Sequence, residues 1–324
     1  MAGIARRSAV RAFAVSRRPA PSVVSLGDLV LDIASSFREP LAPGTDAAAS
    51  IRFRQGGSAA NTARMLARLG ARASFVGSVG RDAWGSALVR SLRDAGVAVH
   101  APRVAGVTAR IVVLVAPDGE RSFATERGAA DGLRPAHLQP AWFHRDALHL
   151  PAYALFHPPL RDAAYAAARS AREAGAVLSV DLASRAPLLA RGRVAAREDL
   201  AGIAPDLLFA NADEAAALTG TRTGARREAL LELAPLVVLK QGPAGCLVLV
   251  RRGSDALALA VATRPLEAVD TTGAGDAFDA GFLFAWLAAP AESRRDLRVL
   301  RVAALAGHRA AHRHLTTVRA EIEP

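Results

Sequence analysis

The sequence predicts an α/β fold that carries a small separate β-sheet. Short, buried, β-branched runs alternate along the chain with longer segments of helical periodicity, and this alternation is typical of strands and helices that share one sheet. Between residues 97 and 126 the period falls to two, around a turn at Pro117-Asp118-Gly119-Glu120. Of the 324 residues 51% are hydrophobic, enough to bury a large core, and either one α/β domain with an appendage or two domains fit this length.

Composition narrows the class of protein. One cysteine, Cys246, rules out an internal disulfide and suits a reducing cytoplasm, and no apolar run reaches the eighteen or so residues that span a bilayer. The formal net charge is +11, but the basic residues are scattered, and all except Lys240 are arginine. Because so few aromatic residues lie between them, we expect a cytoplasmic protein with no nucleic-acid or membrane partner.

The chain begins with an arginine-rich stretch. Residues 1–20 hold five arginines and no acidic residue. An export or transit signal is an alternative, but no apolar segment follows Arg6-Arg7. We expect residues 1–20 to form a disordered tail and residues 21–324 to form the folded domain.

The first strand is expected at residues 22–26, followed by a loop that carries Asp28 and Asp32. Open α/β sheets bind ligands just beyond the carboxyl ends of their strands, so a carboxylate there is a candidate ligand-binding group. Taken alone, a solvated or capping aspartate is the simpler interpretation.

A glycine pair then precedes a helix. Gly56-Gly57 forms a turn, Ser58 is a plausible N-cap, residues 59–69 have strong helical periodicity, and Gly70 ends the helix. Asn61 lies near the first turn and faces whatever the glycines approach. A lone Gly-Gly before a helix is a weak signal of function.

Predicted strands and helices continue to alternate after this helix, and a predicted β-hairpin interrupts the alternation. A predicted hairpin at residues 108–116 and 121–125, together with residues about 35–55, forms the expected lid, whose segments we delimit as 35–55 and 98–127. Arg127 closes this insert, either as a substrate ligand or as a surface residue. The other expected elements are a strand at 73–79, helices at 82–95 and 158–174, strands at 177–181, 207–210 and 236–239, and an edge hairpin at 246–250 and 256–262.

The segment Asp270-Thr271-Thr272-Gly273-Ala274-Gly275-Asp276 leads into a long helix. Its glycines allow close backbone approach, and the helix N-terminus adds partial positive charge, so the turn predicts an anion site. Asp276 would repel a bound phosphate, yet it suits a base that takes a proton from an attacking hydroxyl. The simpler alternative is a carboxylate that only complements the helix dipole.

This segment resembles the C-terminal signature of the ribokinase-like, PfkB-type carbohydrate kinases. Gly56-Gly57-x-x-x-Asn61 resembles the first signature of the same family, and the likeness covers nearly the whole chain after residue 21. The resemblance implies a doubly wound, mostly parallel sheet flanked by helices, a small β-sheet lid, and transfer of the γ-phosphoryl group of Mg-ATP to a hydroxyl of a sugar or sugar-like molecule.

The resemblance also implies roles for individual residues. Asp276 would act as base beside an anion hole of Gly273, Ala274 and Gly275 amides. Asp32, Gly56, Gly57, Asn61 and Arg127 would bind the acceptor; Asn211 and Glu214 would organise nucleotide phosphates and hold Mg²⁺ through water; Lys240, Gly242 and Gly245 would lie beside ATP; and Asp270 and Thr272 match positions of a monovalent-cation site.

The sequence departs from the family pattern near its end. The stretch after His308 lacks the glycine-bearing turn expected to complete the cation site, which weighs against activation by K⁺. His312 and His314 are two residues apart, which is poor spacing for metal ligands on a helix, so a surface role is expected. At Asn211 a helix cap with acidic residues in the first turn is the simple alternative.

Three functions compete at this stage. A sugar kinase comes first, a nucleoside kinase of the same superfamily second, and a non-catalytic sugar-binding or nucleotide-binding regulator third. The intact Gly273-Ala274-Gly275-Asp276 argues against a pure binder, because binding alone needs no base. A lid with exposed sheet edges favours a homodimer.

Overall fold

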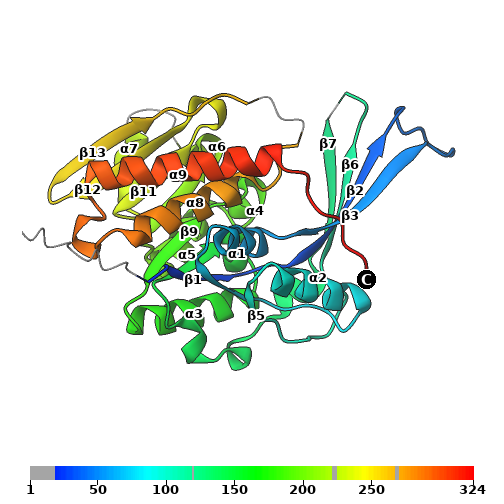
Figure 1. The fold of residues 1–324 in the computed structure, drawn as a ribbon, viewed down its shortest axis with the longest axis horizontal. Helices are drawn as coiled ribbons and strands as arrows, with labels where there is room; N and C mark the ends of the chain where they lie inside the picture. The colour runs from blue at the N-terminus through cyan, green and yellow to red at the C-terminus, as the bar shows by residue number, and fades with distance from the viewer. Residues whose placement is uncertain (1–18, 119, 221–224, 267–269) are drawn as a thin grey trace, which may run out of the picture.

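The computed structural model describes residues 19–118, 120–220, 225–266 and 270–324. Within these residues the chain forms a large sheet covered by helices and a small sheet that projects from one end of it (Figure 1). The predicted tail lies outside the described residues except for its last two positions, as does the turn residue Gly119.

The large sheet contains nine strands in the described part of the chain and is mostly parallel. In sheet order the strands are β13 (Asp255–Val261), β12 (Cys246–Arg252), β11 (Leu236–Lys240), β10 (Leu207–Asn211), β9 (Val177–Asp181), β8 (Ala147–Pro151), β1 (Ser22–Leu26), β4 (Arg72–Val76) and β5 (Ala98–His100). Strands β12 and β13 run antiparallel at one edge, which confirms the predicted edge hairpin.

The small sheet has the order β3 (Ala49–Gly56), β2 (Val30–Phe37), β6 (Arg110–Val115) and β7 (Arg121–Glu126). Two expectations need correction. Asp32 lies within strand β2 and not in a loop, so the small sheet begins at Val30, and the strand at 98–100 pairs with β4 in the large sheet. Hydropathy does not reveal where β1 of the large sheet ends and β2 of the small sheet begins. The apolar run from Ser22 is interrupted there only by Gly27 and Asp28.

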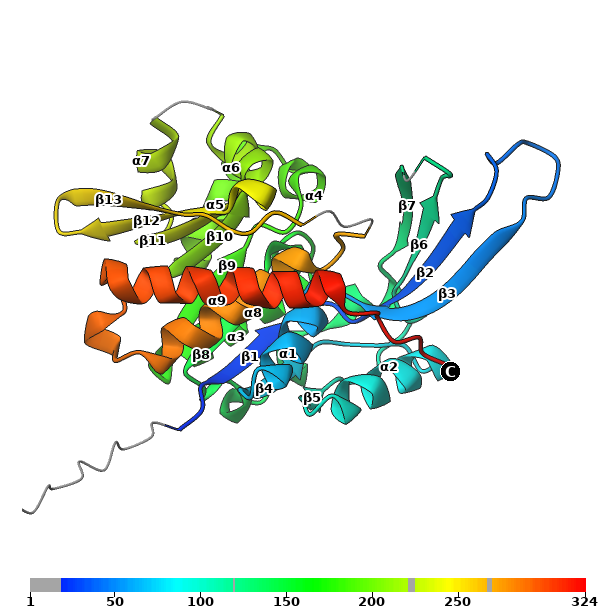
Figure 2. The same cartoon turned by 45° about the horizontal axis from the view of Figure 1, so that its top comes forward.

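Helices cover both faces of the large sheet (Figure 2). On one face lie α1 (Ser58–Arg68), α2 (Ala83–Asp94), α8 (Ala274–Ala288) and α9 (Leu297–Thr316); on the other lie α3 (Leu160–Glu173), α4 (Arg185–Leu189), α5 (Arg193–Ile203), α6 (Ala212–Thr219) and α7 (Ala225–Leu231). Along β10, Leu207 and Phe209 face the first group while Leu208 and Ala210 face the second, so each strand is apolar on both faces. The predicted doubly wound arrangement is therefore confirmed.

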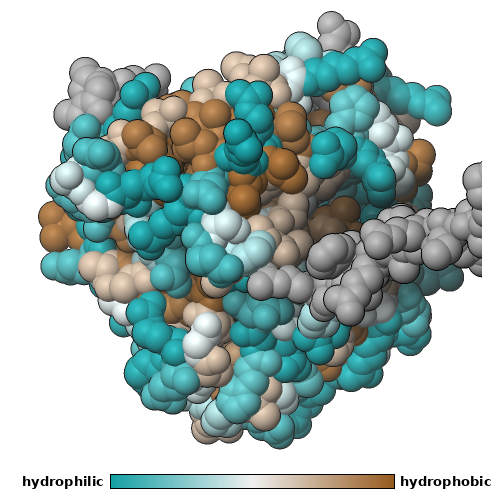
Figure 3. Space-filling view, turned by 60° about the vertical axis from the view of Figure 1, so that its left-hand side comes forward, coloured by the Kyte–Doolittle hydropathy of each residue, from teal (hydrophilic) through white to brown (hydrophobic). Residues whose placement is uncertain are grey.

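This topology fixes where a ligand can bind. From β1 the sheet continues through β4 on one side and through β8 on the other, and such a reversal opens a crevice at the carboxyl ends of the strands. The small sheet stands beside this crevice, while the opposite end of the molecule carries mixed hydrophilic and apolar residues around the edge hairpin (Figure 3). None of the described helices is long and apolar enough to cross a membrane.

Candidate active site

The turn before α8 has the form expected of an anion site. Gly273 is the N-cap residue and takes a left-handed conformation with φ of 82°, which allows the helix to start abruptly at Ala274. The amide of Ala274 donates to the Thr271 carbonyl oxygen over 3.1 Å, whereas the amide of Gly275 has no partner within the helix and lies at its N-terminus. Asp276 therefore lies in the first turn, at the opening of a group of backbone donors.

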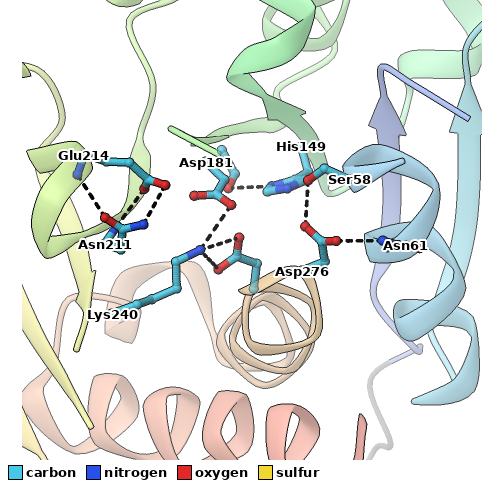
Figure 4. A network of polar contacts seen from close by, with 10 residues as sticks. Ser58, Asn61, His149, Asp181, Asn211, Glu214, Lys240 and Asp276 are labelled. Atoms are coloured by element: carbon cyan, nitrogen blue, oxygen red, sulfur yellow. Dashed lines mark hydrogen bonds and ion pairs between the residues drawn. The ribbon is translucent and has the colours of Figure 1, made fainter. Parts of the chain in front are cut away.

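The carboxylate of Asp276 is held by two side chains from α1. Ser58 Oγ donates to Oδ1 over 2.6 Å, and Asn61 Nδ2 donates to Oδ2 over 2.9 Å (Figure 4). Burial raises the pKa of Asp276 to about 6, although the two hydrogen bonds favour the ionised form. The group is thus an ionised carboxylate at neutral pH that binds a proton more readily than an ordinary aspartate, as a general base requires.

Ser58 differs from its expected role. The N-cap position of α1 is occupied by Gly57, and the Ser58 hydroxyl serves Asp276 instead of the helix. Gly57 has φ of 96°, and a Cβ there would lie 2.5 Å from the Asp28 carbonyl oxygen. A Cβ at Gly56 would collide with the Asp32 carboxylate, so the glycine pair lets α1 start directly against the acidic loop after β1.

At the small-sheet end, acidic and guanidinium groups lie in pairs. Arg127 Nη1 is 3.1 Å from Asp28 Oδ2, and its other nitrogens bond Asp131. Burial works against the charge of Arg127, but Asp28 and Asp131 outweigh it and raise its pKa. Its guanidinium also lies over the ring of Tyr153, 5.5 Å from the centroid. The sequence analysis did not identify Tyr153 as a residue of this end of the site.

Asp32 is buried, and its partner comes from the end of the chain. Arg319 Nη2 lies 3.2 Å from Asp32 Oδ2 and donates to the carbonyl of Gln55 over 3.1 Å. Burial raises the pKa of Asp32 even though Arg319 opposes the shift. No sequence signal pointed to Arg319, because it follows the last helix by only a few residues in an arginine-rich chain.

At the opposite end of the crevice, Asn211 and Glu214 form a capping box at the start of α6. Asn211 Oδ1 accepts from the amides of Asp213 and Glu214, and the Glu214 carboxylate accepts from Asn211 N and Nδ2 over 2.8 and 2.7 Å. The cap that the sequence suggested as the simple alternative is therefore present. Burial, and secondly the neighbouring Asp181, raise the pKa of Glu214 to about 7.

Between these two ends lies a buried charge cluster, Lys240 with Asp181 and Asp279. Lys240 Nζ is 3.1 Å from Asp181 Oδ2 and 3.2 Å from Asp279 Oδ1. The pKa of Lys240 is raised, because the two carboxylates outweigh the effect of burial. The ammonium thus points at carboxylates beneath the anion-binding turn, where a Cβ on Gly275 would lie 3.3 Å from it.

Sequence reasoning missed both carboxylates of this cluster. Asp279 was the one available signal: it is a charged residue one helical turn after Asp276 in an otherwise apolar segment, and a charge there requires a partner. Asp181 gave no such signal, because it is the last residue of a predicted strand. Beside the cluster, the buried His149 bonds Ser179 Oγ through Nδ1 over 3.1 Å, and burial lowers the pKa of His149 to about 4.

The remaining expected residues lie around the same crevice. Gly242 and Gly245 flank a short turn at the end of β11, next to Lys240. Asp270 lies 3.7 Å from Arg54 and 3.9 Å from Arg319, measured from its Oδ2 to the nearest guanidinium nitrogens. His314 is half-buried and not a surface residue, because its Nε2 contacts the Thr272 carbonyl oxygen over 2.8 Å.

Comparisons with known proteins agree with this geometry. A family model described as pfkB family carbohydrate kinase matches residues 20–320. An ATP-dependent ribose-1-phosphate kinase from Halopiger xanaduensis is 35% identical over 281 residues, which are 82% of this chain and 84% of the relative. Adenosine kinase from Sinorhizobium meliloti superposes with a TM-score of 0.77 at 27% identity, covering 93% and 95% of the two chains.

A third comparison supports the fold alone. A fructokinase double mutant from Vibrio cholerae, whose structure holds fructose, ADP and a potassium ion, superposes with a TM-score of 0.73 at 24% identity over 94% and 95% of the chains. The family match spans almost every described residue. This chain also covers 82% of the Escherichia coli fructokinase, to which it is 32% identical. The chain belongs to the pfkB family of carbohydrate kinases, and it is an ATP-dependent sugar phosphotransferase.

Proposed function

We propose that this kinase transfers the γ-phosphoryl group of Mg-ATP to a hydroxyl of a neutral sugar, with Asp276 as the general base. The observation that carries the assignment is the position of Asp276 in the first turn of α8, held between Ser58 and Asn61. An acceptor hydroxyl within reach of this carboxylate would lose its proton as it attacks phosphorus, while the amides of Gly273, Ala274 and Gly275 stabilise the charge on the transferred group.

The charge balance at the acceptor end favours a neutral acceptor. Three guanidinium groups at this end already lie near a carboxylate: Arg127 near Asp28, Arg319 near Asp32, and Arg54 near Asp270. The Arg64 guanidinium bonds the Gln55 side chain and Ser91 instead. A sugar phosphate needs positive charge that is not already compensated. Sugar hydroxyls, by contrast, suit buried carboxylate and amide groups such as Asp32 and Asn61, with Gly56 and Gly57 leaving room for the ring.

The nucleotide would lie along the ends of β10 and β11, beside Asn211, Gly242 and Gly245. Lys240 would act beneath the phosphates, where its charge offsets Asp181 and Asp279 and so keeps the floor of the anion site from becoming strongly negative. This role differs from a direct contact with ATP, and the two short distances from Nζ to those carboxylates support it.

The carboxylates around Lys240 fit a magnesium ion held through water. Asp181, Glu214, Asp276 and Asp279 outnumber the one ammonium, and Asp181 Oδ1 is buried with no hydrogen-bond partner among the described residues. Mg²⁺ keeps several of its waters and binds phosphate oxygens, so it needs few direct protein ligands. Glu214 would hold it through water, and when bound the ion neutralises charge on the phosphates.

The test is ADP release by the purified protein with Mg-ATP against a panel of acceptors. Ribose, fructose, fructose phosphates, ribose 1-phosphate, 2-keto-3-deoxygluconate, inositol and adenosine cover the candidate classes. We expect the highest kcat/KM with a neutral sugar. A preference for a phosphorylated sugar would contradict the charge argument, and a preference for adenosine would support the second candidate, a nucleoside kinase, which the similarity to the Sinorhizobium meliloti enzyme favours.

We also propose that the small sheet closes over the acceptor as a lid and that two copies of it pair in a homodimer. Two large apolar side chains on its strands are exposed to solvent, Ile51 by 58% and Phe123 by 60%. Its outer strands β3 and β7 also present sheet edges, which can pair with another chain.

A further inference from the structure

The last part of α9 contacts the turn that precedes α8. His314 Nε2 lies 2.8 Å from the carbonyl oxygen of Thr272. A carbonyl oxygen can only accept a hydrogen bond, so Nε2 carries the proton and donates it. The imidazole also lies against the following residue, because a Cβ on Gly273 would be 3.0 Å from the same nitrogen. One face of the turn is thus covered by a side-chain donor.

Close packing of α8 on α9 fixes the position of His314 relative to the first turn of α8. A Cβ on Gly281 would lie 2.6 Å from the carbonyl oxygen of Ala306, and a Cβ on Gly307 would lie 2.9 Å from Phe278. These glycines let the two helices approach closely, so sliding one along the other would create clashes. The last turn of α9 therefore meets the first turn of α8 in one register, with the imidazole beneath Thr272.

Beyond α9 the chain continues to the base of the small sheet. In Figures 1 and 2 this red segment leaves the helix and runs past β3 towards α2. Ile322 N donates to the carbonyl oxygen of Phe53 over 2.9 Å, and this contact fixes the segment on β3. Arg319, between these two anchors, reaches Asp32, the Gln55 carbonyl and the neighbourhood of Asp270.

Two guanidinium groups lie at the other end of the turn, next to the carboxylate that a bound cation would need. The Asp270 carboxylate faces Arg54 from β3 and Arg319 from the C-terminal segment. The groups whose charges act on His314 are Arg319 and Arg68, against one acid, Asp270. An added cation would meet these guanidinium groups at short range in a partly buried place, where repulsion is poorly screened.

Asp270 and Thr272 are the positions that the sequence matched to a monovalent-cation site. The residues around them do not fit such an ion. An ion of this kind is held by oxygen atoms such as backbone carbonyls. Here the Thr272 carbonyl receives an N–H from His314, and the Asp270 carboxylate lies between two guanidinium groups. The glycine-bearing turn that would supply further oxygens from the C-terminal stretch is replaced by continued helix through Thr316.

We propose that His314, together with Arg54 and Arg319, replaces a monovalent cation in holding the anion-binding turn, so that this kinase binds nucleotide and turns over without potassium. His314 is a positioning residue: it acts on the phosphates through the Thr272 carbonyl and the amides that follow. The inference rests on the proposed phosphoryl site at Gly273–Asp276.

The first experiment uses the unmodified protein in KCl, NaCl and choline chloride at equal ionic strength. The dissociation constant of ADP, measured by titration calorimetry, and kcat/KM for ATP are expected to change by less than roughly twofold among the three salts, since ionic screening is the same in each. Tighter ADP binding or higher kcat/KM in KCl than in choline chloride, by tenfold or more, would overturn the inference.

The second experiment changes the donor. His314→Ala removes the hydrogen bond and is expected to weaken ADP binding and lower kcat/KM for ATP about tenfold, with the KM for the acceptor unchanged. His314→Gln places an N–H donor at a similar distance and is expected to restore most of the loss. His312→Ala, on the same half-buried stretch of α9, is the matched control and is expected to behave as the unmodified protein.

Wild-type ADP affinity and kcat/KM in His314→Ala would contradict the positioning role. If that variant does not fold, the salt series on the unmodified protein still decides the question. Failure of the underlying assignment is separable, because Asp276→Asn tests the phosphoryl site through turnover and is expected to leave the salt dependence of ADP binding unchanged.

Discussion

The charge cluster around Lys240 and an ion pair on the small sheet lie in different surroundings. At the phosphoryl end, Lys240 is 15% exposed and its partners Asp181 and Asp279 are 5% and 0% exposed. On the small sheet, the Arg110 and Glu126 side chains form a shorter ion pair of 2.7 Å but are 44% and 54% exposed. The first group is enclosed between a helix and the sheet, whereas the second lies on a two-sided sheet that contacts solvent.

This difference predicts how strongly a substitution in each charge pair will affect the protein. Buried charges keep one geometry because leaving any of them unpaired is costly. Exposed or half-exposed pairs contribute little to stability and rearrange easily. We therefore expect substitutions at the phosphoryl end to affect folding and turnover strongly, and substitutions at the small-sheet end to affect mainly acceptor binding and assembly.

The largest effect on stability is expected from Lys240→Met. It leaves two buried carboxylates without their cation and should lower the free energy of unfolding by about 3–5 kcal/mol, measured by urea denaturation at pH 7.5. The control Arg110→Met, at the exposed pair, should change it by less than about 1 kcal/mol. Equal losses in the two variants would contradict the contrast between the two regions.

The largest effect on turnover is expected from Asp276→Asn, which should lower kcat by roughly 100-fold or more while ADP binding stays near normal. In the unmodified enzyme, the pKa of about 6 means that the carboxyl holds a proton below pH 6 and cannot accept another. Its kcat/KM should therefore fall as the pH drops through about 6. Near-normal turnover in the variant would show that another group is the base.

Asp32→Asn tests the acceptor end. If Asp32 binds the acceptor as proposed, removing its charge should raise the KM for the acceptor about tenfold, with the KM for ATP nearly unchanged. Initial-rate measurements with each substrate varied in turn give both values. A parallel rise in the KM for ATP would mean that Asp32 acts on the whole site and not on the acceptor alone.

Glu214→Gln should raise the magnesium concentration needed for half-maximal activity several-fold, because it removes the charge that we propose supports the ion through water. The pKa of Glu214, about 7, places its protonated form below that pH. The magnesium requirement of the unmodified enzyme should therefore rise as pH falls from 8 to 6, and the variant should lose most of this dependence. A variant with the same magnesium requirement as the unmodified enzyme would exclude the role.

The smallest effect on the chemistry is expected from Phe123→Asp on β7. A charge at this exposed apolar position should convert the proposed dimer to a monomer in light-scattering measurements, and kcat should change less than in the other variants. Val302→Asp, on the exposed side of α9, is the control. A monomeric unmodified protein would refute the dimer directly.

Much of the fold was predictable because its signals are local. Helices expected at 59–69, 82–95 and 158–174 match α1, α2 and α3 to within two residues, since periodicity and glycine stops depend only on neighbouring residues. The boundary between the two sheets was not predictable, because the apolar run after Ser22 continues through it. Asp32 accordingly lies in a strand of the small sheet.

The sequence alone determined the alternation of strands and helices, several of their positions, the glycine-rich turn before α8, and Asp276 and Asn61 as candidate site residues, because each follows from residues close together in the chain. The tertiary structure decided their partners. Lys240 meets Asp181 across 59 positions, His314 meets Thr272 across 42, and Arg319 meets Asp32 across 287. Such pairings depend on which strands are neighbours and how closely two helices pack, and no local pattern of residues encodes those distances.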